Sequence, residues 1–132
     1  MGTYDRVQER TGWGLPRPSD ARRTADEVAD LIELSRDPDP KARKVALANL
    51  CPCHVRADHP EVWDRVFEMV DDPDPVVRRA VVHMLGDGSP RYRAPEVAEV
   101  LERLRNDRDR VVRRQVRRVL QAYNRTGRIN VL

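Results

Sequence analysis

The sequence has few aromatic residues and no long apolar run, and both absences restrict the structures that it can form. Aromatic side chains make up 5% of its 132 residues, so a core must be built mainly from valine, leucine and alanine. No apolar run reaches the roughly 18 residues of a membrane-spanning helix, and the opening residues, MGTYDRVQER, lack the apolar region of a signal peptide. We therefore expect a cytoplasmic protein that does not bind a membrane.

The motifs of common catalytic sites are missing as well. The sequence contains no glycine-rich phosphate loop, no nucleophile elbow and no HExxH motif. Its aspartates do occur in three pairs two residues apart, but these pairs stand at expected helix starts, two of them beside prolines, where capping explains them better than metal or acid–base chemistry. We expect neither enzymatic activity nor a cofactor, apart from the zinc alternative that the cysteines raise.

Charge, in contrast, is abundant and unevenly distributed. Charged residues make up 36% of the chain, which suits helices with long solvated faces. Residues 106–132 contain eight arginines against two aspartates, whereas the formal net charge of the whole chain is only +3. The basic character is therefore concentrated at the C-terminal end.

One sequence motif occurs three times at a fixed interval. DPDPKARKVALANL at residues 37–50 returns as DPDPVVRRAVVHML at 72–85 and as DRDRVVRRQVRRVL at 107–120, an interval of 35 residues each time. The second aspartate of each copy can cap a helix, and in the first two copies a proline follows at the first helical position. Apolar residues then recur with the helical period. Each copy therefore predicts a helix with one buried face.

A second helix is expected upstream of each copy. The triplet PEV occurs at residues 60–62 and 95–97, and apolar positions in these segments also repeat at 35 residues. Asp58 and Glu61 are spaced as a capping box. The sequence thus predicts an all-α chain of three antiparallel helix pairs. The expected helices span about residues 20–35, 40–51, 60–70, 75–85, 95–105 and 110–123.

DPDPxxR followed by an alanine, valine and leucine stripe resembles the HEAT repeat, particularly its bacterial form related to the phycobilin lyase type. The resemblance covers about residues 20–124. It implies a short right-handed α-solenoid whose second helices line the concave side and whose members mostly bind other macromolecules. The expected organisation is a tail or cap at 1–18, a repeat domain at 19–124 with units of about 20–54, 55–89 and 90–124, and a C-terminal tail at 125–132.

The resemblance also implies polar bonds between neighbouring repeats. In the family, the aspartate of the turn and the arginine four positions later commonly bond across repeats. The third copy departs from the pattern, because Arg108 and Arg110 replace both prolines. The residues that match are Asp39 with Arg43, Asp74 with Arg78, and Asp109 with Arg113.

An adaptor that holds another protein is the leading functional hypothesis. Leu47 and Val82 are equivalent residues that we expect to project from the concave side, one position beyond the buried Ala46 and Val81. They would form a dry centre within a positive rim, suited to an acidic surface or helix, unless one of the chain's own tails covers them. The predicted partner-binding residues are Lys44, Leu47, Arg79, Val82, Arg114, Arg117 and Arg118.

Nucleic-acid binding is the first alternative. On a wheel of about 100° per residue, Arg110, Arg114, Arg117 and Arg118 share one face of the last helix. HEAT-like glycosylases that repair alkylated DNA use such a basic concavity, although their catalytic residues have no match in this chain. A solvated basic face that complements the acidic first helices would have the same pattern.

A zinc- or redox-responsive regulator is the second alternative. The segment CPCHVRADH at residues 51–59 offers thiolate and imidazole ligands, but their spacing fits none of the common structural zinc motifs. Two cysteines one residue apart also make a strained disulfide, so we expect reduced thiols or half of a metal site. The simpler reading is a small half-buried cysteine at a helix end. The candidate ligands are Cys51, Cys53, His54, His59 and His83.

Overall fold

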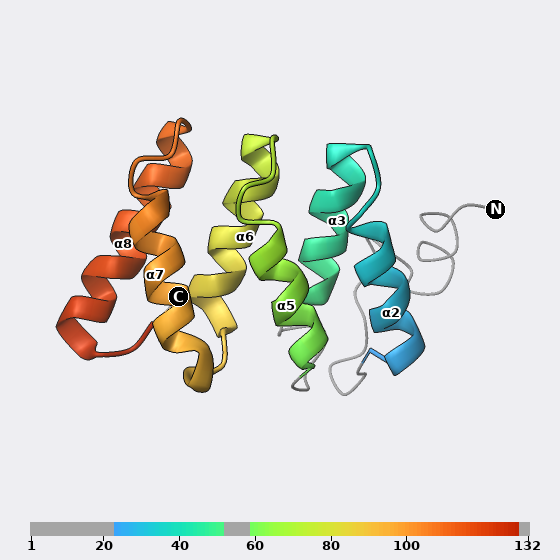
Figure 1. The fold of residues 1–132 in the computed structure, drawn as a ribbon, viewed down its shortest axis with the longest axis horizontal. Helices are drawn as coiled ribbons and strands as arrows, with labels where there is room; N and C mark the ends of the chain where they lie inside the picture. The colour runs from blue at the N-terminus through green and yellow to red at the C-terminus, as the bar shows by residue number, and fades with distance from the viewer. Residues whose placement is uncertain (1–22, 52–58, 130–132) are drawn as a thin grey trace. The chain divides into compact units, whose positions relative to one another are not determined.

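The computed structural model describes residues 23–51 and 59–129, and all regular structure within them is helical (Figure 1). Six α-helices and one short 3₁₀ helix are present in these ranges, and no strand. The chain divides into two compact units, one ending at Arg65 and the other beginning at Val66. None of the helices in the described ranges has the length and apolar character needed to cross a membrane.

The first unit contains one antiparallel helix pair, α2 (Ala25–Leu34) and α3 (Pro40–Leu50). Thr24 starts α2 through a capping box, in which its hydroxyl accepts from the Glu27 N–H and the Glu27 carboxylate accepts from the Thr24 N–H. This cap explains why α2 begins later than the predicted residue 20. Asp39 accepts from the Lys41 N–H at the start of α3, with Pro40 in the first turn.

The next helix, α5 (Pro60–Glu68), contains the division between the units. Within the first unit, Arg65 of α5 forms hydrogen bonds with the residue that follows the C-terminal end of α2. The guanidinium donates from Nε to the Ser35 hydroxyl at 2.8 Å and from Nη2 to the Ser35 carbonyl at 3.0 Å. The buried Ser35 therefore has partners on both its side chain and its backbone. The predicted capping residue Asp58 lies outside the described residues.

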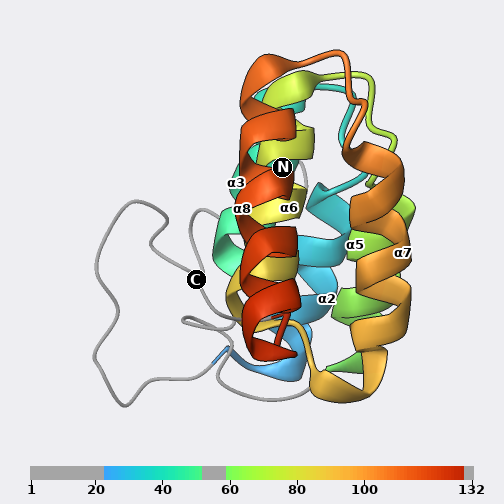
Figure 2. The ribbon, with the colours of Figure 1, turned by 90° about the vertical axis from the view of Figure 1, so that its left-hand side faces the viewer.

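The second unit contains α6 (Pro75–Gly88), the 3₁₀ helix η1 (Arg91–Arg93), α7 (Ala94–Leu104) and α8 (Arg110–Thr126). Within it, α6 and α8 lie side by side in one layer and α7 packs against α8 from the other (Figure 2). The carboxylate of Asp74 accepts from the N–H groups of Val76 and Val77, which caps α6. The predicted helix starts at residues 40, 75 and 110 are confirmed.

The C-terminal end of α8 closes with a left-handed glycine. Gly127 has φ 71° and donates its N–H to the Tyr123 carbonyl at 2.7 Å, a common way to end an α-helix. Ile129 then returns to a buried position. Within the segment predicted as a C-terminal tail, residues 125 and 126 thus belong to α8 and Ile129 is buried.

Candidate binding surface

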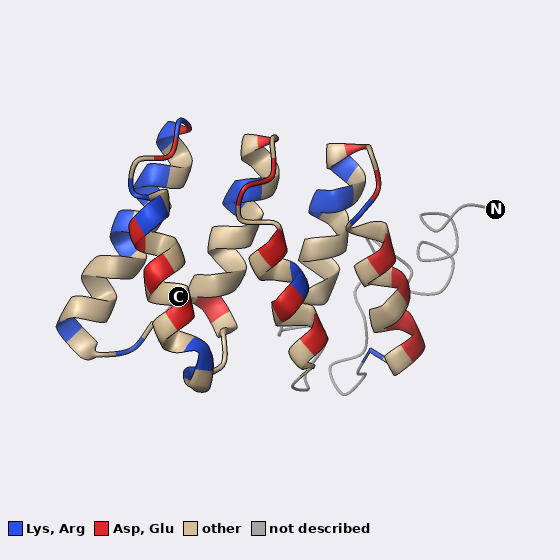
Figure 3. Cartoon of the chain, in the orientation of Figure 1, with Lys and Arg blue, Asp and Glu red and all other residues tan. Residues whose placement is uncertain are grey.

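α8 exposes five arginines on one face, and we name this set the arginine stripe. On a wheel of about 100° per residue they fall within an arc of about 100°, and Gln121 lies inside the same arc. No acidic residue occurs on α8, whereas α7 carries three glutamates and one arginine (Figure 3). The arginine stripe consists of Arg110, Arg114, Arg117, Arg118 and Arg125.

The opposite face of α8 explains why the stripe points outward. Val112, Val116 and Val119 are fully buried there, and Leu120 adjoins them. The carboxylate of Asp109 accepts from the Val112 N–H and starts the helix. Burial of the valine face fixes the rotation of α8, so the arginines are directed to solvent.

The arginines of the stripe differ in their bonding from their neighbour Arg113. Arg113 donates from Nη1 to the carbonyls of Asp107 at 2.7 Å and Arg108 at 3.1 Å, inside its own turn. Within the described parts of the chain, the five stripe arginines make no side-chain hydrogen bond and no ion pair. Their charges are therefore available to a partner.

Two bidentate ion pairs connect α6 to the turn before α8. Arg78 donates to the two carboxylate oxygens of Asp107 at 2.9 and 3.0 Å, and Arg79 donates to those of Asp109 at 2.9 and 2.8 Å. The Arg78–Asp107 pair is buried, with side-chain exposures of 6% and 7%. Arg78 also donates from Nη1 to the carbonyls of Asp72 and Pro73 in its own turn.

These pairs join neighbouring repeats in a register that differs from the one expected. Arg78 bonds to the first aspartate of the next turn, Asp107, while the second aspartate, Asp109, bonds to Arg79. Asp107 was not among the residues predicted to bond between repeats, although the first aspartate recurs in every copy of the motif. Arg43, the counterpart of Arg78 in the first unit, donates to the carbonyls of Asp37 and Pro38 in its own turn.

The Arg79–Asp109 pair shifts the titration of both groups. The pKa of Asp109 lies well below its ordinary value, mainly because its carboxylate accepts hydrogen bonds from Arg79. The hydrogen bond from the Val112 N–H lowers this pKa further. The same hydrogen bonds raise the pKa of Arg79. Arg79, which we predicted to bind a partner, is thus already engaged within the second unit.

The prediction that Leu47 and Val82 project to solvent is wrong, because both are 0% exposed. On the helical wheel, Leu47 and Val82 each lie about 60° from the last leucine of the apolar stripe on the same helix, Leu50 or Leu85. The buried face of each helix is therefore wider than the predicted stripe. The equivalent residue on α8 is Arg117, which is exposed. Of the other predicted partner-binding residues, Lys44, Arg114, Arg117 and Arg118 are exposed.

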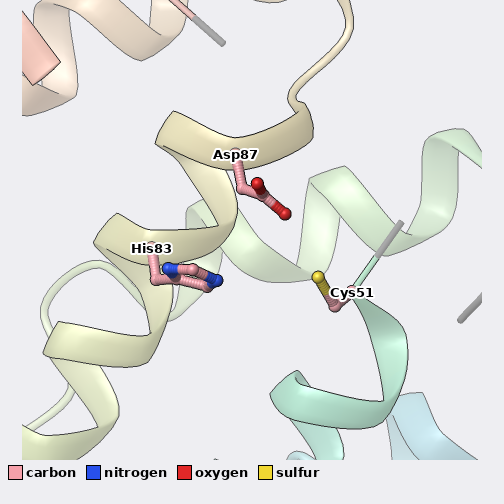
Figure 4. A group of neighbouring side chains, drawn as sticks. All are labelled: Cys51, His83 and Asp87. Atoms are coloured by element: carbon pink, nitrogen blue, oxygen red, sulfur yellow. The ribbon is translucent and has the colours of Figure 1, made fainter. Parts of the chain in front are cut away.

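The candidate zinc ligands are distributed over both units and the undescribed segment. Within the second unit, an imidazole nitrogen of His83 and a carboxylate oxygen of Asp87 lie within 4.8 Å of each other, one turn apart on α6 (Figure 4). Asp87 was missed, although its i,i+4 spacing from His83 was visible. Cys51 ends α3 in the first unit as a buried thiol, and Nδ1 of His59 lies 3.2 Å from a Glu61 carboxylate oxygen. The other two candidates, Cys53 and His54, lie outside the described residues.

The helix pairs and their repeated capping turns define the class of protein, an all-α helical-repeat protein of the α-solenoid type. Residues 28–121 match the family model described as HEAT repeats, so the chain belongs to the HEAT-repeat family. HEAT repeats generally mediate protein–protein interaction. Comparison with curated proteins and with solved structures gave no match. The narrower resemblance to the phycobilin lyase type stays a prediction.

Proposed function

We propose that the protein is a scaffold without catalytic activity that binds a strongly acidic macromolecule on the arginine stripe. The observation that supports this function is the set of five arginines on one face of α8 that have no bonding partner among the described residues. A guanidinium forms two parallel hydrogen bonds with a carboxylate or a phosphate, and it keeps its charge at any physiological pH. The stripe therefore suits an extended row of acidic groups.

The apolar side chains of the described surface give less support to a mainly apolar interface. The exposed large apolar residues among those described are Val76, at 38%, and Tyr92, at 63%, and neither belongs to α8. The burial of Leu47 and Val82 removes the dry centre that the sequence had indicated. Protein interfaces gain much of their affinity from an apolar core, so this surface depends on charge instead.

Intrahelical repulsion also favours a functional role for the stripe. Arg110, Arg114 and Arg118 follow one another at i,i+4 spacing, and no acidic residue on α8 offsets their charges. Each such pair of like charges destabilises a helix by about 0.2–0.5 kcal/mol. A surface that costs stability in this way is expected where binding requires it.

A charge-reversal experiment tests the proposed function. The variant Arg114→Glu, Arg117→Glu, Arg118→Glu should leave immobilised heparin at much lower salt than the wild-type protein. The matched control Arg36→Glu, Arg91→Glu, Arg105→Glu changes the net charge equally but alters exposed arginines outside α8. We expect the control to elute close to the wild-type protein. Circular dichroism of all three proteins checks that the helices are intact.

Equal elution of the two variants would show that net charge alone governs retention, and the proposed function would fail. The same pair of variants extends the test to native partners. Proteins or nucleic acids captured from a lysate by the wild-type protein should be lost by the stripe variant and kept by the control. A partner that both variants keep does not bind at the stripe.

A further inference from the structure

We propose that the macromolecule bound by the arginine stripe is a nucleic-acid duplex, held by its phosphate backbone without reading of the base sequence. This inference rests on the proposed function and names the chemistry of the partner. Four features of α8 lead to it: the composition of the stripe, its length, the absence of an aromatic side chain from it, and the buried opposite face.

The composition of the stripe favours phosphates over a protein surface. Arginine occurs in protein–protein interfaces too, but there it accompanies an apolar core, whereas interfaces with nucleic acid are more polar and much more positively charged. The stripe contains five arginines, and its arc also includes Gln121 but no apolar residue. A glutamine side chain can also donate to a phosphate oxygen, so every residue inside the arc suits this ligand.

The dimensions of α8 suit a duplex. Its 17 residues span about 25 Å, which corresponds to about seven base pairs at a rise of about 3.4 Å each. Successive stripe residues at i,i+4 are about 6 Å apart along the helix axis. The arginines can therefore contact several phosphates along one strand.

A duplex fits better than a single strand, because single strands are commonly held by bases stacked on aromatic side chains. Tyr123 is the aromatic residue of α8, and it is half-buried on the face opposite the stripe. Reading of base edges usually requires a helix to enter the major groove. The valine face of α8 is packed inside the second unit, so the duplex can contact α8 only along the stripe, whose arginines suit the phosphate oxygens of the backbone.

Fluorescence anisotropy with a labelled 20-base-pair DNA duplex tests the inference. We expect a Kd of about 1–100 µM near 0.1 M salt and a slope of log K against log salt approaching about −4.5, if each of the five arginines contacts a phosphate. The variant Arg114→Gln, Arg117→Gln, Arg118→Gln should reduce the slope to about −1.8. The corresponding glutamine changes at Arg36, Arg91 and Arg105 should leave it unchanged.

Two further ligands distinguish a failure of the duplex inference from a failure of the proposed function. Polyglutamate with the same number of charges presents carboxylates, and the single strand of the duplex presents the same phosphates without the double helix. Tighter binding of the duplex than of either ligand supports the inference. Equal or tighter binding of polyglutamate overturns it in favour of an acidic protein and leaves the proposed function intact. Equal or tighter binding of the single strand overturns the duplex assignment. Binding of none of the three, with equal elution of the heparin variants, removes both proposals.

Discussion

Asp109 connects three parts of the second unit, two through its carboxylate and one through its backbone N–H. It caps α8 through the Val112 N–H and receives two hydrogen bonds from Arg79 of α6, while its own N–H donates to Asp107 at 2.8 Å. A neutral side chain at this position could still cap the helix but would lose the charge pair with Arg79. The ionised carboxylate is therefore the form that stabilises the fold.

This arrangement predicts how stability depends on pH. The pKa of Asp109 is lower in the folded state than its unfolded value of about 3.9, so near that pH the unfolded state binds more protons and stability rises with pH. The stabilisation is fully present above about pH 5 and is lost as the pH falls toward the folded pKa. At pH 7 the wild-type protein should unfold at a higher urea concentration than the variant Asp109→Asn. The difference between their unfolding midpoints should shrink at pH 3. A difference that does not change with pH would contradict this assignment.

At the scale of helices, the sequence predicts the elements better than the bonds between them. The starts of α3, α6 and α8 each follow from an aspartate that can cap a helix and from the residues after it. These are local features of the sequence. The partner of Arg78 depends on the register between two helices, which no local pattern specifies. In the same way, the wheel placed Leu47 beside the apolar stripe of α3 but could not show that it would be covered.

The buried pair between α6 and the α8 turn gives a prediction at this scale. Arg78→Met should destabilise the protein by about 3–5 kcal/mol, because the Asp107 carboxylate would remain buried without its counter-charge. Arg103→Met is the matched control, since its ion pair with Asp71 is exposed and such pairs contribute about 0–1 kcal/mol. Urea unfolding of both variants gives the comparison. Similar losses for the two would mean that Arg78 contributes no more than a surface arginine.

At the scale of the whole chain, the two helices of each pair differ in charge. α2 carries four acidic residues and no basic one, while α3 carries three basic residues and no acidic one. α7 and α8 repeat this contrast, and it is strongest in α8. The composition of the chain showed an excess of arginine near its end, and the structure shows which of these arginines have a partner among residues 23–51 and 59–129.

The unpaired charges predict an unusual response to salt. Arg114→Gln, Arg117→Gln, Arg118→Gln should raise the melting temperature at low salt by about 2–6 °C, because removal of like-charge repulsion worth about 1 kcal/mol stabilises α8. The difference should fade near 1 M salt, where the Debye length is about 3 Å. Calorimetry at both salt concentrations measures it, with Arg36, Arg91 and Arg105 changed to Gln as the control. A lower melting temperature for the stripe variant would mean that these arginines stabilise the folded chain through partners of their own, and the stripe would then not be a free binding surface.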